Sequence, residues 1–408
     1  MELRKGYKQT EMGVIPEEWR MRNLGTVCDV RDGTHESPRF FDTGVPFVTS
    51  KNIVNGELDL ENVSYIATAD AIEFDKRSKV DRNDILMSMI GTIGSAVLIN
   101  FEPTFCIKNV ALLKPLKVEP PYLIQLINSP LFQRYLGENL DGGIQKFVSL
   151  GTLRQLAIPV PDKPEQSAIA TALSDVDALL AAQDALIAKK RAIKQGATQE
   201  LLTGKRRLPG FTGEWEETCL GDVATFHKGK GLPKSALSHD GPESCVHYGE
   251  LFTQYGETIR ETISRTKKSP GEFRSIANDV LMPTSDVTPR GLAKASCMVL
   301  DDVVLGGDIL VIRTNHLLIS GTFLSHIIRH DEEQVLRLVT GTTVFHLYGT
   351  EMKKFTCKLP PILEQQAIVA LLSDLAAEIV ALEAKRNKTA QVKQGMMQEL
   401  LTGRIRLV

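Results

Sequence analysis

Apolar residues recur at alternating steps of four and three along two long stretches of the chain, the spacing that aligns them on one seam of a coiled coil. Polar and charged residues fill most of the remaining positions. The pattern therefore predicts two long helices that each bury a narrow apolar stripe. The seam residues are Ile169, Leu173, Val176, Leu180 and Ile187 in the first stretch, and Ile368, Leu372, Leu375, Ile379 and Leu382 in the second.

Start and stop signals agree with this pattern. Pro161 and Pro164 precede the first helix, Pro360 and Pro361 precede the second, and Leu-Thr-Gly closes both. Proline is favoured in the first turn of a helix and glycine just past its end. The sequence predicts one spacer helix within residues 161–206 and another within 362–408. About 38 helical residues give a rod roughly 57 Å long.

The two stretches are copies of each other. At an offset of 199 positions, residues 165–208 and 364–407 align without a gap and share 22 of 44 residues. Both copies begin with Glu-Gln, and both end with Gln-Glu-Leu-Leu-Thr-Gly. Fixed-period self-similarity of this kind is the signature of a duplicated architecture. Two equal helices in one chain can bury their seams on each other.

The segments before the helices, residues 1–160 and 207–361, correspond only at scattered anchors. In both, short β-type runs alternate with Gly/Asn/Asp turns and with short helical patterns, over 122–137 and 321–339. Each is expected to be a mixed α/β domain. The anchors are Glu18-Trp19 with Glu214-Trp215, and Asn83–Met87 with Asn278–Met282. The fold class expected is α+β: two mixed α/β domains separated by two long helices, which pair as an antiparallel coiled coil in a pseudo-two-fold internal repeat.

Composition narrows the class of protein. The chain is 42% hydrophobic and carries a formal net charge of −2, so it is neither disordered nor held on nucleic acid by bulk positive charge. It has no apolar run long enough to span a membrane, and its first residues lack a signal peptide, so we expect a cytoplasmic chain. Six scattered cysteines with no CxxC spacing indicate reduced thiols, and we expect no metal site.

Three short motifs suggest chemistry, and none has its full context. Glu119-Pro-Pro-Tyr122 approaches the (D/N/S)PP(Y/F) motif of amino-methyltransferases, but glutamate departs from that pattern, and a proline-capped helix is the better interpretation. Gly229–Ser235 has the wrong spacing for a phosphate-binding loop. Glu383-Ala-Lys385 lies on the second helix without a nuclease's paired aspartate. The sequence therefore predicts no catalytic residues.

The whole layout resembles the specificity (S) subunit of type I restriction-modification systems, in which two target recognition domains are each followed by a conserved helix. The paired helical blocks carry most of this resemblance. Residues 1–160 and 207–361 would then be the first and second target recognition domains. Shorter stretches that resemble the family are Gly13–Trp19, Leu208–Trp215, Arg31–His35 with Pro38, Gly91–Gly94, His227–Lys234 and Tyr248–Leu251.

The resemblance implies a non-catalytic DNA-specificity protein. Each recognition domain would read one half of a bipartite target in double-stranded DNA, and the helices would set the spacing and dock two methyltransferase (M) subunits. Two restriction (R) subunits can join such a complex. S-adenosylmethionine, ATP and Mg²⁺ would be used by these partner subunits and not by this chain. Docking points expected on the helices are Ala178-Leu179 and Met396-Met397.

Candidate DNA contacts are polar residues in loops beside glycines or at the ends of strands, where side chains can reach base edges and phosphates. In the first domain they are Arg31, Gly33, Thr34, His35, Arg39, Lys51, Asn52, Thr92, Lys108, Asn109, Gln145 and Lys146. In the second they are Lys228, Lys230, Lys234, Tyr248, Arg290, Lys294, Thr342 and Thr343.

Two other classes of function stay open at this point. A near-neutral chain with two globular domains and two rods could be a protein–protein adaptor with two ligand-binding domains. A single-chain adenine methyltransferase that uses the Glu119 motif is the other alternative.

Overall fold

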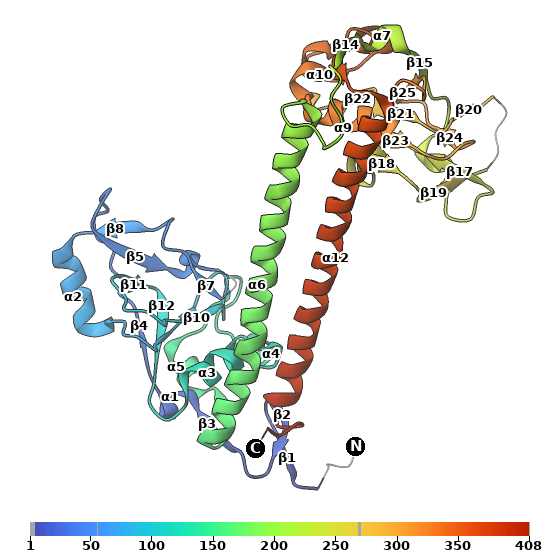
Figure 1. The fold of residues 1–408 in the computed structure, drawn as a ribbon. Helices are drawn as coiled ribbons and strands as arrows, with labels where there is room; N and C mark the ends of the chain where they lie inside the picture. The colour runs from blue at the N-terminus through green and yellow to red at the C-terminus, as the bar shows by residue number, and fades with distance from the viewer. Residues whose placement is uncertain (1–4, 55, 268–270, 408) are drawn as a thin grey trace. The chain divides into compact units, whose positions relative to one another are not determined.

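The computed structural model describes residues 5–54, 56–267 and 271–407, and it divides into two compact units. The first unit joins residues 1–185 to residues 383–408, and the second comprises residues 186–382. Each unit therefore contains one α/β domain and about half of each long helix (Figure 1). Among the described residues, no helix is long and apolar enough to cross a membrane.

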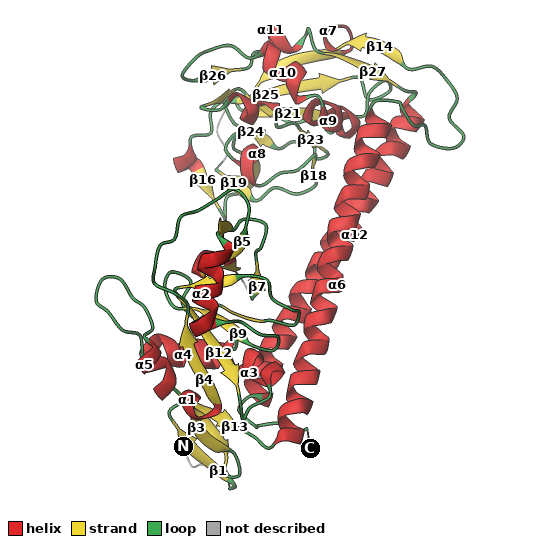
Figure 2. Cartoon of the chain, turned by 90° about the vertical axis from the view of Figure 1, so that its left-hand side faces the viewer, coloured by secondary structure: helices red, strands yellow, loops and turns green. Residues whose placement is uncertain are grey.

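A four-stranded antiparallel sheet forms the centre of the first domain, with strand order β10-β9-β12-β4 (Figure 2). Its buried face carries alternating apolar residues such as Val30, Ile85 and Leu113, which pack against α3 and α4. The strands are β4 (Cys28–Asp32), β9 (Ile85–Ser88), β10 (Ala96–Leu98) and β12 (Val110–Pro115), and the two helices are α3 (Pro120–Ile127) and α4 (Pro130–Glu138).

A smaller three-stranded sheet, with order β11-β5-β8, lies beside the central one in the first domain, and its core includes Phe47 and Phe74. Three two-stranded pairs complete the domain: β1–β2, β3–β13 and β6–β7. These elements are β1 (Tyr7–Thr10), β2 (Gly13–Pro16), β3 (Arg20–Asn23), β5 (Val45–Thr49), β6 (Ile53–Val54), β7 (Glu57–Leu58), β8 (Ser64–Ile66), β11 (Cys106–Lys108), β13 (Ala157–Val160), α1 (Leu24–Val27), α2 (Thr68–Ser78), α5 (Leu150–Gln155) and the 3₁₀ turn η1 (Ser50–Asn52).

The second domain has the same framework with two larger sheets, ordered β15-β25-β21-β23-β18 and β16-β19-β17-β24-β20, and the pairs β14–β27 and β22–β26. Its elements are β14 (Glu216–Cys219), β15 (Ala224–Lys228), β16 (Leu237–Ser238), β17 (Glu243–Val246), β18 (Thr258–Ile259), β19 (Ser264–Thr266), β20 (Phe273–Arg274), β21 (Asp279–Pro283), β22 (Ser285–Asp286), β23 (Ser296–Met298), β24 (Val304–Leu305), β25 (Ile309–Thr314), β26 (Phe345–His346), β27 (Thr356–Leu359), α7 (Leu220–Val223), α8 (Glu250–Thr253), α9 (Gly321–His330), α10 (Glu332–Leu338), α11 (Gly349–Met352), η2 (Lys234–Ala236) and η3 (Pro289–Ala293).

The Asn-Asp anchor shared by the two domains has a structural cause. Asn83 and Asn278 both adopt positive φ angles, 73° and 83°, which asparagine tolerates better than most residues. The aspartate that follows is buried and pairs with a cation on the neighbouring strand. Asp84 binds Lys114 at 2.5 Å, and Asp279 binds Arg313 at 2.8 Å. The anchor therefore fixes the same turn into the same strand, β9 or β21, in both domains.

The two long helices are α6 (Lys163–Leu202) and α12 (Ile362–Leu400), and they lie side by side in both views. In the first unit Lys393 pairs with Asp177 at 2.5 Å, and in the second Lys190 pairs with Glu378 at 2.7 Å. Residue numbers rise along one helix as they fall along its partner. The expected antiparallel coiled coil is confirmed.

Burial along the predicted seam is strongest near the domains. Ile169, Leu173, Ile368 and Leu372 are fully buried, whereas Val176, Leu180, Leu375 and Leu382 are half-buried. Ile187 and Ile379 are buried as well. In the first unit the seam also holds Gln183, which is 7% exposed and donates to Oγ1 of Thr389 at 3.3 Å. A polar pair at a seam position fixes helix register at some expense of stability.

Candidate nucleic-acid interface

Several predicted contact residues of the first domain meet at one end of its central sheet. Because neighbouring strands are antiparallel, the C-terminal ends of β4 and β9 lie beside the N-terminal ends of β10 and β12. The loops around residues 33–35, 91–95 and 108–109 therefore leave the sheet at the same end. We call this end the His35 edge.

His35 is the best-connected side chain of this edge. Its Nδ1 lies 2.7 Å from Oδ1 of Asn109, and its Nε2 lies 2.8 Å from Oδ2 of Asp32. The Asp32 carboxylate is 5% exposed and also binds the guanidinium of Arg77 from α2. The imidazole itself is exposed, so these contacts orient it without covering it. The ammonium group of Lys108, beside Asn109, donates a hydrogen bond to Oγ of Ser37 at 2.6 Å.

Three predicted contact residues at this edge have structural roles in the fold. A Cβ atom on Gly33 would lie 2.4 Å from the carbonyl oxygen of Ile107, so only glycine fits there. Thr34 is buried, and its hydroxyl accepts from the backbone of Glu36. Asn52 is also buried, and its amide group holds the turn that follows β5. The predicted DNA contacts from Thr34 and Asn52 have no exposed side chain to make them, whereas Lys51 beside Asn52 is exposed.

Thr92, Gln145 and Lys146 lie on two loops that adjoin. A β-bridge joins Ile90, just before Thr92, to Phe147, and residues 142–147 are exposed. This second loop is anchored at its base by Asp141. Its Oδ2 accepts from the backbone N–H of Ser149 at 2.8 Å and from Oγ1 of Thr152 at 2.7 Å, and these hydrogen bonds lower the pKa of Asp141.

Arg31 and Arg39 do not join this group. Arg31 turns back along β4 and binds Asp29 at 2.6 Å, and it also donates to the backbone carbonyl of Arg77. Arg39 lies over the ring of Phe41 at 5.4 Å, in the loop before β5. Both guanidinium groups are at the surface, but the structure does not bring them together with His35.

The same end of the central sheet in the second domain is the Lys228 edge. Lys228 faces Leu310 across β15 and β25, just as Asp32 faces Ala111 across β4 and β12. Positions 111 and 310 are 199 apart, the offset of the internal repeat. The two domains therefore place opposite charges at one position of a shared framework. Lys228 is 63% exposed and lies 3.4 Å from Asp308.

A cavity of about 600 Å³ opens beside Lys228. Its polar lining includes Ser285, whose Oγ is 2.9 Å from Nδ1 of His346, and the ring of His346 stacks on Tyr348. Thr342 and Thr343 are exposed in the loop closed by the bridge between Thr340 and His346. This bridge repeats the Asp141–Phe147 bridge of the first domain at the repeat offset of 199.

The other predicted contacts of the second domain are dispersed around this edge. Lys230 lines a separate cavity of about 440 Å³ beside η2, where Lys234 begins the turn and is exposed. Tyr248 is half-buried between His247 and Phe252. Arg290 is exposed on η3 and pairs with Glu332 at 3.3 Å, and Lys294 is exposed just after η3.

Sequence patterns missed the partners that orient these side chains. Asp32, Arg77, Asp308, Ser285 and His346 each touch a predicted residue or line its cavity. All except Asp32 are distant in the chain from the residue that they touch or from Lys228. The only available signal was the acidic residue directly after Arg31, within a motif already singled out. On the helices, Leu179 is 49% exposed as a docking point requires, but Met397 is buried in the core and cannot serve as one.

The Glu119 motif caps a helix, as the sequence analysis favoured. Glu119 is the residue before α3, and prolines occupy the first helical positions. Its backbone N–H donates to Oε1 of Gln166, and its carboxylate pairs with Lys163 at 3.2 Å. Among the described residues no group of three or more His, Cys, Asp or Glu side chains could hold a metal ion.

Comparison with known proteins agrees with this architecture. The family model of the type I restriction modification DNA specificity domain matches the chain twice, over residues 16–189 and 212–393. The MjaX type I restriction enzyme specificity subunit of Methanocaldococcus jannaschii is 24% identical over 428 residues, covering 99% of this chain and 97% of that protein.

Solved structures share the fold. The S subunit of a type I restriction-modification system from M. genitalium is 14% identical, with a TM-score of 0.57 over 98% of both chains. A chain from a study of complex assembly and conformational transition of the type I R-M system is 16% identical. Its TM-score is 0.59, over 96% of this chain and 99% of that one.

The duplicated domain and the antiparallel helices, together with the two matches to the DNA specificity domain, define a class of non-catalytic DNA-specificity proteins. The chain belongs to the family of type I restriction-modification specificity proteins, with two recognition domains. As a member of that family it binds DNA and assembles with other subunits of a restriction-modification system.

Proposed function

We propose that each domain reads one half of a bipartite sequence in double-stranded DNA, the first through the His35 edge and the second through the Lys228 edge. One observation carries this proposal: the two edges share strand register but differ in side-chain chemistry, with Asp32 in one where Lys228 stands in the other. A shared framework with exchanged polar groups suits two readers of different bases, because each base pair presents its own donor and acceptor pattern.

Exposed and half-buried residues of the two edges are the proposed contacts. His35 and Asn109 suit base readout, because each is held by neighbours while a polar edge stays accessible. Lysines suit phosphate contacts, which position a protein without reading sequence. The full proposed set is His35, Lys51, Thr92, Lys108, Asn109, Gln145 and Lys146, with Lys228, Lys230, Lys234, Lys294, Thr342 and Thr343; Arg31, Arg39, Tyr248 and Arg290 would contact the DNA backbone at its margins.

The paired helices would act as the spacer between the half-sites and as the docking platform for partners. Leu186 and Ile193 support the docking role, since both are apolar, lie one heptad apart on α6, and are 40% and 44% exposed. Apolar groups repeated on one exposed helical face are typical of a surface that another helix covers. The partners we propose are two methyltransferase subunits, with two restriction subunits joining for cleavage.

Chemistry would reside in those partners, with S-adenosylmethionine on the methyltransferase subunits and ATP with Mg²⁺ on the restriction subunits. The complex would act on cellular DNA, so we assign the chain to the cytoplasm. The proposal that catalysis occurs on the partner subunits agrees with the helix-capping role of the Glu119 motif in this chain.

Methylome sequencing tests the proposal. The chain is produced with its methyltransferase partner in a host that lacks adenine methylation, and methyladenine positions are mapped across the genome. We expect one asymmetric motif in two parts separated by a fixed number of unspecified bases. A contiguous motif would contradict the two-reader proposal, and an absence of methylation in an assembled, folded complex would favour the adaptor alternative.

A further inference from the structure

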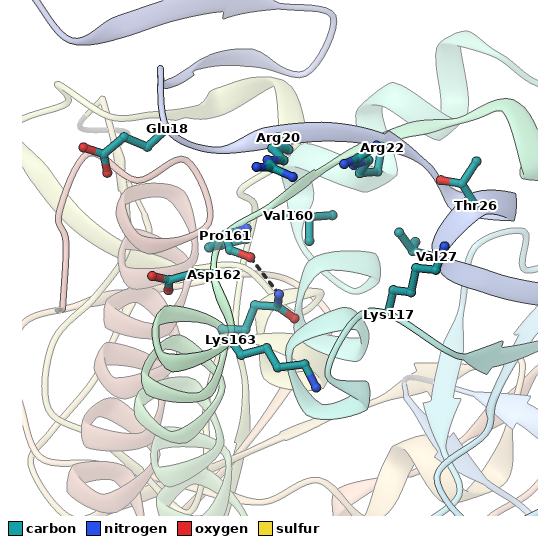
Figure 3. A pocket seen from close by; sticks show the side chains of 11 residues that line it. Glu18, Arg20, Arg22, Thr26, Val27, Lys117, Val160, Pro161, Asp162 and Lys163 are labelled. Atoms are coloured by element: carbon teal, nitrogen blue, oxygen red, sulfur yellow. Dashed lines mark hydrogen bonds between the residues drawn. The ribbon is translucent and has the colours of Figure 1, made fainter.

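A cationic cavity lies in the first domain where β3 runs close to the start of α6 (Figure 3). It has a volume of about 460 Å³ and is bordered by β3, the segment after β12, and the first turn of α6. Because β4 and β12 are antiparallel, the segment after β12 leaves the sheet at the end opposite to His35. We call this cavity the Arg20 cavity. Its charged lining residues are Glu18, Arg20, Arg22, Lys117, Asp162 and Lys163.

Strand geometry brings the two arginines together. Arg20 and Arg22 are two positions apart on β3, so their side chains leave the strand on the same side. Met21 between them packs against the domain core. Lys117 is held at the cavity because its backbone N–H donates to the carbonyl of Val27 at 3.1 Å. Figure 3 shows the arginines on β3, with Lys117 and Lys163 rising from other segments.

Three of the four cations that line this cavity lack protein partners, whereas Lys163 pairs with Glu119 at 3.2 Å and both carboxylates have partners. Within the described ranges, Arg20, Arg22 and Lys117 form no ion pair and no side-chain hydrogen bond, and all three are exposed. Glu18 is paired with Arg406 at 3.2 Å, and Asp162 accepts from the backbone N–H of Glu165 at 3.0 Å. Uncompensated positive charges in one concave site favour a multiply charged anion.

The second domain shows that this charge is not part of the shared framework. Arg20 faces Val160 in the β3–β13 pair, and Glu216 faces Leu359 at the equivalent position of β14–β27. Arg22 is likewise replaced by Thr218. At the repeat offset of 199, Lys117 corresponds to His316. A role common to both domains, such as folding or docking of two equivalent subunits, would not need cations in only one of them.

We propose that the Arg20 cavity binds an oligophosphate, either an inorganic chain or the phosphate tail of a nucleotide. Each guanidinium can donate two parallel hydrogen bonds to adjacent phosphate oxygens, and lysines add mobile point charges. Three unpaired cations together match a ligand with several negative charges better than a single carboxylate. Val27, Val160 and Thr26 supply a less polar wall on which a nucleoside can rest.

Calorimetric titration of the purified full chain with inorganic tripolyphosphate tests this proposal. We expect saturable binding that the double variant Arg20→Gln/Arg22→Gln weakens at least tenfold, without a change in melting temperature. Matched controls are Glu216→Gln, at the equivalent strand of the second domain, and Lys76→Gln, at an exposed lysine of α2 outside both proposed sites. Neither control should alter tripolyphosphate binding. A second titration with ATP distinguishes the two kinds of oligophosphate. Tighter binding of ATP than of tripolyphosphate identifies a nucleotide site, and equal binding identifies a site for an inorganic chain.

Two results would overturn the proposal. One is tripolyphosphate binding that is absent at millimolar concentration or is unchanged in the double variant. The other is a double variant that loses affinity for a duplex of unrelated sequence while tripolyphosphate fails to bind, which would make the cavity a contact for the DNA backbone. Both readouts are independent of the proposed half-site recognition, so failure of either proposal leaves the other standing.

Discussion

The guanidinium of Arg406 binds the carboxylate of Glu165 although the two residues are 241 positions apart. Glu165 lies in the first turn of α6 and is 1% exposed, and it also accepts from the indole N–H of Trp19 at 2.8 Å. In the second unit Arg207 binds Glu364 in the same way, through two contacts of 2.6 Å. The Glu in the first turn of each long helix is thus held by an Arg that follows the end of the other long helix.

Replacement of Arg406 should therefore destabilise the first unit. Arg406→Met removes the cation and leaves the buried Glu165 carboxylate without its ionic partner. An uncompensated buried charge of this kind lowers the free energy of unfolding by about 3 kcal/mol. Chemical denaturation measures the loss. Lys76→Met is the control, because Lys76 and its partner Glu73 are both 67% exposed, and such pairs contribute little. Equal stability of the two variants would contradict a structural role for the Arg406–Glu165 pair.

Thiol reactivity should single out Cys219. Burial raises the pKa of Cys28, Cys106 and Cys357 to about 12 and that of Cys245 and Cys297 to about 11, with nearby acidic groups adding to the effect at Cys106 and Cys245. Cys219 is partly exposed and is free of disulfide bonding.

At pH 8 a chromogenic disulfide reagent should thus modify one thiol per folded chain, and all six in denaturant. Cys219→Ser should abolish the fast reaction. Rapid modification of two or more thiols in the native chain would show that the cores around the other cysteines open readily.

Stability of the second unit should fall on mild acidification. His326 in α9 is 8% exposed, and burial lowers its pKa, with Lys194 and Arg329 adding to the effect and Glu257 opposing it. The unfolded chain takes up a proton near pH 6.5, and the folded chain does so only at lower pH. The contribution of neutral His326 to the free energy of unfolding is therefore complete above about pH 6.5 and is lost as the pH falls below that value.

Denaturation at pH 7.5 and pH 5.5 measures this dependence. His326→Leu should reduce the difference in unfolding free energy between the two pH values. His239→Gln, at an exposed histidine, should leave the difference unchanged. A pH dependence that persists fully in His326→Leu would assign the effect to other groups.

The structure also explains which features the sequence could predict. The helical seam and its Pro and Gly boundaries are local patterns, and Ile169 and Leu372 are buried as the spacing required. The Glu-Gln motif was visible as a repeat, but its purpose was not, because Arg406 and Trp19 reach Glu165 only through the fold.

The candidate interface was predictable only in part, for the same physical reason. Loop glycines and polar residues singled out the segment of His35, yet the sequence could not distinguish an exposed polar group from one that holds its own turn, as Asn52 does. Burial of a short polar side chain depends on distant strands and leaves no periodic signal.

Spacer length should follow helix length if the paired helices set the distance between half-sites. Seven residues inserted into each helix, between Ala185 and Leu186 and between Ala384 and Lys385, preserve the seam and add about 10.5 Å. We expect the methylated motif to keep both halves and gain roughly three unspecified base pairs, at 3.4 Å each. Insertion into one helix alone should instead mismatch the seam and lower the melting temperature. An unchanged spacer in a folded double-insertion complex would show that the helices do not measure the distance.

The most direct test of the central claim, that each domain reads its own half of the target, is a paired methylome. The chain is assembled with its methyltransferase partner as wild type, as His35→Ala/Asn109→Ala, and as Lys228→Ala/Thr343→Ala. Base-edge contacts contribute ~1–3 kcal/mol of discrimination each, enough to relax sequence preference visibly. The account predicts that the first variant relaxes one half of the motif and the second relaxes only the other half. Loss of preference in both halves with either variant, or in neither half with both, would contradict it.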